Sequence, residues 1–260
     1  MCHADIPPGE ATPDVVRRDV EIGLPTGEAM PAQHVVTVPG APAVLIIADM
    51  LGRSPFYEHL AALVAAAGFQ ALLPDVFFRQ GPLAEAGAEA AIARRAKLDE
   101  RQSVEDMRAA VGWLGARCAG TAVGTIGFCM GGTFALDLAS TQDDLVTVAY
   151  YGFPEPPPWV VSPPPRPIDL VDSLRGPVLA FWGDQDDTVG LASVERYAER
   201  ARAANTHFEH TVLPGLGHGF LGSAALGDSA DAAGATWTRT IAHLRDHLDA
   251  EGAQPSTAAD

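Results

Sequence analysis

The middle of the chain reads Thr125-Ile126-Gly127-Phe128-Cys129-Met130-Gly131-Gly132, a cysteine set among glycines. This segment joins an apolar run at 122–126 to an amphipathic run at 133–139, which is the pattern of a strand, a tight turn and a helix. A side chain in the middle of such a turn is held clear of the backbone on both sides, as in a nucleophile elbow. Because glycine-bounded cysteines also occur as buried core residues, this interpretation depends on partners elsewhere in the chain.

Apolar and helical segments alternate on both sides of this turn. Apolar runs predict strands at 43–48, 70–73, 145–151, 177–182 and 207–213; the first is continuously apolar, which is typical of a strand buried on both faces of a parallel sheet. Helices are predicted at 54–67, twice within 82–118, from the cysteine turn to about 140, at 192–204 and at 231–248. Two β-type runs, 15–22 and 33–38, predict a leading antiparallel hairpin. The sequence therefore predicts an α/β fold with a single doubly wound, mostly parallel sheet flanked by helices.

Composition suggests where this domain begins and ends. Residues 1–13 are rich in proline and glycine and are predicted to be poorly ordered, the domain is expected to span 14–249, and 250–260 are predicted to form a disordered tail. Eight prolines exclude regular structure from the loop 154–167, whose position after a strand makes it a candidate wall of a pocket.

The charge of the chain limits its partners. The formal net charge is -16, with Lys97 as the single lysine, so the surface repels nucleic-acid phosphates and anionic membranes. We find no apolar stretch of transmembrane length and no basic region followed by an apolar core at residue 1. Three unevenly spaced cysteines indicate free thiols in a reducing compartment. We therefore expect a soluble, cytoplasmic protein, either a monomer or a small homo-oligomer.

Four turns after predicted strands carry reactive side chains: Asp49, Cys129, Asp186 and His218. Active-site groups of open α/β sheets collect beyond the carboxyl ends of the strands, so we expect these four to lie together. A thiol attacks as its thiolate, and His218 is the base that can accept its proton. A carboxylate must then hold the imidazole in one tautomer, and Asp186 is placed for this role. The order of nucleophile, acid and histidine along the chain is the order found in α/β-hydrolases.

Each of these residues also has a purely structural interpretation. A single cysteine is more often a small buried hydrophobe, an aspartate after a strand is usually a turn former, and a histidine between glycines can be a loop residue. Asp184 and Asp187 compete with Asp186 for the acid role. We prefer Asp186 because the spacing Gly-x-x-Asp brings its carboxylate round the turn.

Six segments together resemble the dienelactone hydrolase family, and the resemblance extends from about residue 15 to 248; they are 48–52, 74–80, 127–132, 150–152, 183–186 and 217–220. The resemblance implies an α/β-hydrolase fold without a metal or organic cofactor. It also implies a small-molecule ester or lactone substrate that is cleaved through an acyl-cysteine. The backbone N–H groups of Met130 and Met50 would hold the oxyanion, where losing one donor typically costs about 3 kcal/mol.

Two positions depart from the family pattern. Members that resemble the dienelactone-opening enzyme carry a glutamate in the first strand turn, where it contacts the resting thiol, whereas this chain has the shorter Asp49. Direct contact with Cys129 therefore requires the backbone to compensate. Such members also carry an arginine four residues after the histidine, where this chain has Gly222. Without that charge-assisted partner, a less charged ester is at least as well suited as an anionic dienelactone.

Several further residues are candidates for substrate binding. Arg94, Arg95 or Arg101 would replace the missing arginine, unless they form a solvated helix face. Tyr150, Tyr151 and Phe220 are candidates to line the pocket, although tyrosines at a strand end also serve as packing residues. We predict an ester or lactone hydrolase in which Asp49 tunes the resting thiol, and the alternative is a catalytically silent domain that binds a small ligand or a protein.

Overall fold

The computed structural model describes residues 3–85, 87–118, 122–142, 144–157 and 164–248. These residues form one sheet in the order β1-β2-β4-β3-β5-β6-β7-β8. The β1/β2 and β2/β4 pairs are antiparallel and the other pairs are parallel. The strand bounds are β1 (Arg17–Gly23), β2 (Ala29–Val36), β3 (Ala43–Ile47), β4 (Gln70–Pro74), β5 (Val123–Phe128), β6 (Leu145–Tyr150), β7 (Val178–Gly183) and β8 (Phe208–Leu213).

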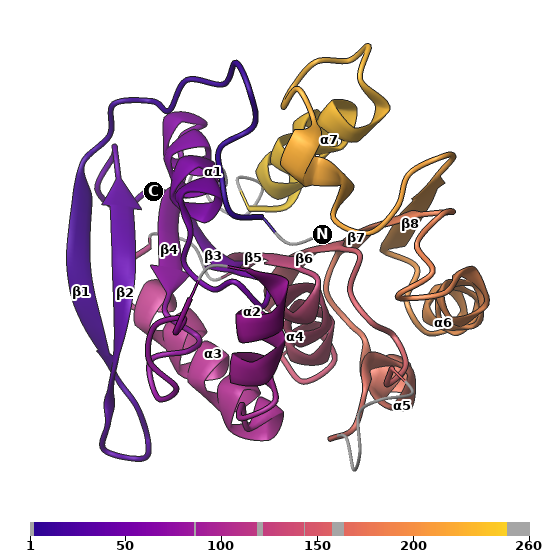
Figure 1. The fold of residues 1–260 in the computed structure, drawn as a ribbon, viewed down its shortest axis with the longest axis horizontal. Helices are drawn as coiled ribbons and strands as arrows, with labels where there is room; N and C mark the ends of the chain where they lie inside the picture. Colours follow the sequence, from indigo (N-terminus) through magenta and orange to yellow (C-terminus); the bar gives the residue numbers. More distant parts are fainter. Residues whose placement is uncertain (1–2, 86, 119–121, 143, 158–163, 249–260) are drawn as a thin grey trace, which may run out of the picture.

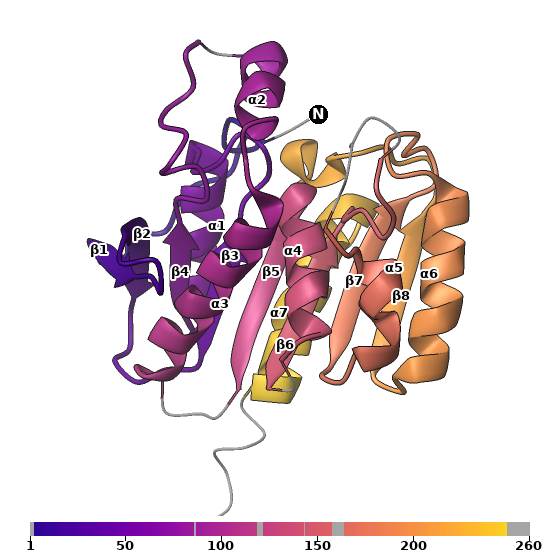
Figure 2. The ribbon, with the colours of Figure 1, turned by 90° about the horizontal axis from the view of Figure 1, so that it is seen from below.

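Helices cover both faces of this sheet. Figure 1 shows α1 (Pro55–Ala66) and α7 (Ala232–Leu248) on one face, with α3 (Glu100–Gly115), α4 (Met130–Ala139) and α6 (Leu191–Ala204) on the other. Figure 2, seen from below, looks onto the face of the sheet, with α3 and α4 in front of the strands. Two short helices, α2 (Ala88–Arg95) and α5 (Pro167–Leu170), complete the set of described α-helices. The predicted doubly wound, mostly parallel sheet with a leading hairpin is confirmed.

Burial explains why these strands form the centre of the molecule. Every residue of β3, β4, β5, β6 and β7 is buried, as expected for strands that are covered on both faces. The edge strand β8 is buried only at its two end residues. Within the described part of the chain, no helix is long and apolar enough to cross a membrane.

The start of the chain makes contacts that its composition does not predict. Residues 3–13, whose composition indicates poor order, instead have defined contacts, and His3 is 3% exposed. Ser54 occupies the N-cap position of α1, but its hydroxyl donates to the carbonyl oxygen of His3 at 2.7 Å rather than capping the helix. The predicted tail, 250–260, lies outside the described residues, so its disorder stays a prediction.

Candidate active site

Cys129 lies between β5 and α4 with a backbone φ of 56° and ψ of -118°. A non-glycine residue at positive φ is strained, and the surrounding structure must hold it in place. Here the Cys129 N–H donates to the carbonyl oxygen of Tyr150 at 3.0 Å, and the residue is 8% exposed. This is the geometry of the elbow that the sequence predicts.

The two glycines around the turn are needed for close backbone contacts. A Cβ on Gly127 would collide with the Gly131 carbonyl, and a Cβ on Gly131 would collide with the Ile47 carbonyl. The amino end of α4 therefore packs directly against the end of β3. This contact brings Met130, the first residue of α4, close to the loop that carries Met50. The backbone N–H groups of these two residues are the predicted oxyanion donors.

His218 and Asp186 meet at the carboxyl ends of β8 and β7. The Nδ1 atom of His218 lies 2.7 Å from Oδ2 of Asp186, and the side chains are 11% and 2% exposed. The other carboxylate oxygen, Oδ1, accepts the N–H groups of Thr188 and Val189 at 3.0 Å each. These bonds fix the carboxylate so that it can orient the imidazole.

The competing aspartates have other surroundings. Asp184 Oδ1 accepts the Gly215 N–H at 2.7 Å, so this residue holds the loop that precedes His218 rather than the imidazole. Asp187 is exposed. Of the three candidates, the structure brings Asp186 to His218.

Asp49 is fully buried, and its carboxylate is occupied by backbone and histidine donors. Oδ2 accepts the backbone N–H of His3 at 2.8 Å and lies 3.0 Å from Nδ1 of the same residue, while Oδ1 accepts the Leu51 N–H at 2.8 Å. His3 supplies two of these contacts, and no local sequence pattern indicates it as a partner of Asp49. The tuning of the resting thiol by Asp49 stays a prediction.

The tyrosines at the end of β6 separate into two roles. Tyr150 is fully buried, stacks on Phe128 with ring centroids 5.0 Å apart, and lies with its hydroxyl 2.6 Å from that of Thr240 on α7. It is a packing residue. Tyr151 has a φ of 40°, and its ring centroid lies 5.1 Å from the rings of both His218 and Phe220. Tyr151 and Phe220 therefore lie beside the candidate base.

Two of the three arginines proposed to bind a substrate carboxylate, Arg94 and Arg95, have protein partners, and Arg101 is exposed. Arg94 stacks on Phe77 and donates to the carbonyl oxygens of Met50 and Leu51 at 3.2 and 2.9 Å. Burial lowers the pKa of Arg94, and Asp75 and Asp49 act in the opposite direction. Arg95 pairs with Glu100 at 2.8 Å. Arg94 therefore ties α2 to the loop that carries the predicted oxyanion donor.

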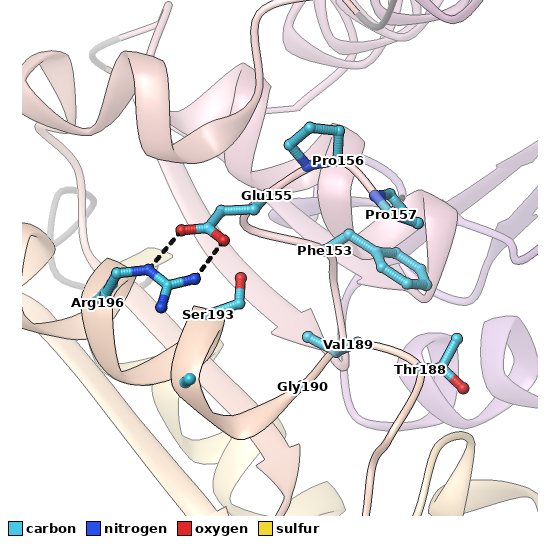
Figure 3. Close-up of a pocket in the computed structure, with 10 residues that line it drawn as sticks. Phe153, Glu155, Pro156, Pro157, Thr188, Val189, Gly190, Ser193 and Arg196 are labelled. Carbon is cyan, nitrogen blue, oxygen red and sulfur yellow. Dashed lines mark hydrogen bonds and ion pairs between the residues drawn. The ribbon is translucent and has the colours of Figure 1, made fainter. Parts of the chain in front are cut away.

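A pocket of about 260 Å³ (Figure 3) is lined in part by Thr188 and Val189, whose N–H groups donate to Asp186. The Phe153 ring, on its wall, is 5.6 Å from that of His218. Glu155 and Arg196 form an ion pair across one side, with two Arg196 nitrogens bonded to the two carboxylate oxygens. The start of the proline-rich loop supplies part of the wall, as predicted, while 158–163 lie outside the described residues. The lining residues are Phe153, Glu155, Pro156, Pro157, Thr188, Val189, Gly190, Ala192, Ser193 and Arg196.

Comparison with known proteins extends this picture. The chain is 31% identical over 258 residues to a carboxymethylenebutenolidase of Rhodococcus opacus, covering 95% of this chain and 98% of that protein. It is 33% identical over 236 residues to carboxymethylenebutenolidase 2 of Cupriavidus pinatubonensis, covering 90% and 93%. A solved structure from Klebsiella pneumoniae has a TM-score of 0.77 at 23% identity and covers 89% of this chain and 99% of that one, which shows the shared fold. Because the sequence profile of the dienelactone hydrolase family also matches residues 30–248, the chain belongs to the dienelactone hydrolase family.

Proposed function

We propose that the protein hydrolyses a carboxylic ester or lactone through an acyl-cysteine intermediate. Cys129 is the nucleophile, His218 the base and Asp186 the residue that orients the base. The proposal rests on how these residues are arranged around Tyr150 and Tyr151. The strained turn at Cys129 donates its N–H to the Tyr150 carbonyl, and the ring of His218, which is hydrogen-bonded to Asp186, lies against the ring of Tyr151. Membership of a hydrolase family favours this activity over a catalytically silent binding domain.

The proposed chemistry begins with attack of the Cys129 sulfur on the substrate carbonyl carbon. Nε2 of His218 takes the thiol proton, and the backbone N–H groups of Met130 and Met50 receive the developing oxyanion. The C–O bond to the leaving alkoxide then breaks, and His218 returns the proton to that oxygen. Water subsequently attacks the thioester and gives its proton to His218, which releases the acid and restores the thiol. The position of the cysteine at the amino end of α4 favours the thiolate charge.

The substrate class follows from the names of the relatives and from the site. The two relatives described above are carboxymethylenebutenolidases, and a further one, from Bradyrhizobium, is named a probable 2-oxo-3-(5-oxofuran-2-ylidene)propanoate lactonase. These names support a lactone as substrate. Because Gly222 offers no charge and Arg94 is bonded to backbone carbonyls, we propose that the lactone or ester need not carry a carboxylate.

Replacing the nucleophile tests the activity directly. We expect Cys129→Ala to lower kcat for p-nitrophenyl acetate by about 10³-fold or more, because no other group can form the acyl-enzyme. The matched control is Cys118→Ala, which removes the other described thiol, shortly after the end of α3. The proposal is wrong if Cys129→Ala turns over the ester as fast as the parent protein.

A further inference from the structure

The leading segment of the chain crosses the same edge of the sheet as the candidate active site. Residues 3–12, which we call the leading strap, pass between α1 and α7 (Figure 1). Glu10 Oε1 accepts the Leu226 N–H at 3.0 Å, and the Thr12 hydroxyl lies 2.9 Å from Nδ1 of His59 on α1. Together with the bond from Ser54 to the His3 carbonyl, these contacts hold the strap at both of its ends.

The imidazole of His3 is the deepest part of this strap. Its ring stacks on Phe56 with centroids 4.4 Å apart and an interplanar angle of 18°. Each ring nitrogen has two neighbours: Nδ1 lies 3.0 Å from Asp49 Oδ2 and 3.1 Å from the Tyr57 hydroxyl, and Nε2 lies 3.0 Å from the Tyr151 hydroxyl and 3.2 Å from the Gly219 carbonyl. A buried ring with partners on both nitrogens is fixed in orientation.

Gly222 makes room for this ring. A Cβ at position 222 would lie 2.6 Å from Cδ2 and 3.3 Å from Nε2 of His3. Gly222 is not among the residues with positive φ, so the backbone itself would accept another amino acid. The glycine is therefore required by the imidazole and not by the turn, and His3 fills the volume that a side chain at 222 would need.

We propose that His3 is a positioning and specificity-determining residue of the active site, and this rests on the proposed hydrolytic function. The Tyr151 backbone is strained, and the hydroxyl of this residue is held by His3 while its ring lies against His218. His3 thus fixes one wall of the site beside the base. Because His3 holds the Tyr151 ring against His218, only compact acyl groups reach Cys129.

The pairing of His3 with Gly222 can be tested without measuring activity. Gly222→Ala should displace His3 and raise the rate at which a glutamate-specific protease cleaves after Glu10 by about tenfold, because the strap opens more often. In a His3→Ala background the same change should have no further effect, since the added methyl group then has space. Gly112→Ala is the control, because a Cβ on Gly112 meets no atom within 4 Å. Equal effects of Gly222→Ala in both backgrounds would overturn the pairing.

Acyl-chain selectivity tests the role in the reaction. For p-nitrophenyl acetate, butyrate and octanoate, His3→Ala should raise the ratio of kcat/KM for octanoate to that for acetate by about tenfold. His3→Phe, which keeps a ring in the same volume but no longer holds the Tyr151 hydroxyl, should give a ratio between those of the parent protein and His3→Ala. A merely structural role for His3 would change all three esters alike, and that result would overturn the proposal. If the parent protein hydrolyses none of these esters, the proposed function fails, while the protease measurement still decides the pairing.

Discussion

Two histidine–aspartate pairs lie on either side of Tyr151, and they differ in exposure rather than in chemistry. In the first pair Nδ1 of His218 is 2.7 Å from the Asp186 carboxylate, and in the second Nδ1 of His3 is 3.0 Å from that of Asp49. The His218 side chain is 11% exposed and lies beside the pocket, whereas the His3 side chain is 1% exposed and both of its nitrogens face protein groups. The same two functional groups can thus serve proton transfer in one place and positioning in another, and access decides which.

The largest expected difference lies between the two carboxylates. Asp186→Asn should lower kcat/KM for a short ester by about 10³-fold, because the amide no longer balances the imidazolium or fixes its tautomer. Asp49→Asn should lower the same constant by no more than about tenfold, because its carboxylate holds His3 rather than orienting the proposed base. Both variants are compared by steady-state kinetics on p-nitrophenyl acetate. Similar losses in the two variants would remove the distinction between the pairs.

A smaller effect is expected at the tyrosine that supports the buried pair. The Tyr57 hydroxyl accepts the Asp49 N–H at 3.2 Å and contacts Nδ1 of His3, and burial raises the pKa of Tyr57 well above its usual value. Tyr57→Phe leaves that N–H buried without its acceptor, so the free energy of unfolding should fall by about 1–3 kcal/mol.

Tyr150→Phe provides the matched comparison for Tyr57→Phe, since it also removes a buried hydroxyl, the one that contacts Thr240. Urea unfolding should report a loss of stability in both variants. Only Tyr57→Phe should shift acyl-chain selectivity in the direction of His3→Ala. A selectivity shift in Tyr150→Phe would show that acyl-chain selectivity responds to any loss of stability and not to the contacts of His3.

The smallest effect concerns a histidine that belongs to neither pair. Burial, together with the nearby His247, lowers the pKa of His243 on α7 to about 4. The unfolded chain then binds the proton more tightly than the folded one, so His243 reduces stability as the pH falls from about 6.5 towards 4. His243→Gln should remove about 1–3 kcal/mol of this acid sensitivity. Thermal unfolding between pH 7 and 4.5 measures it, with the exposed His207→Gln as control; an unchanged pH slope would contradict the assignment.

Much of the fold was predictable because its signals are local. Apolar runs such as 43–47 mark buried parallel strands, and the glycines on either side of Cys129 mark a turn that only small residues permit. The order of Cys129, Asp186 and His218 along the chain also predicted which strand ends would carry the reactive groups. The acid was harder to assign, because three aspartates follow β7 within five residues and only the folded turn separates them.

The leading strap could not be predicted, because its contacts are not local in the sequence. The contacts of His3 with Asp49, Tyr151 and Gly219 join residues that are 46, 148 and 216 positions apart, and no periodic pattern encodes them. Its composition, rich in proline and glycine, is that of a segment without secondary structure, and such a segment can still be ordered by side-chain burial. The same segment supplies His3 as a partner of Asp49, a contact that the sequence did not predict.

The link between Arg94 and the loop after β3 has a consequence for how the protein responds to heat. Arg94 ties the Met50–Leu51 carbonyls to α2, and Ala91 is the one residue of α2 that is buried. Helices with so little buried surface open locally at a lower free energy than the sheet does. The loop proposed to hold the oxyanion is thus anchored to a helix with little buried surface, so we expect heat to inactivate the protein at a lower temperature than it unfolds the sheet.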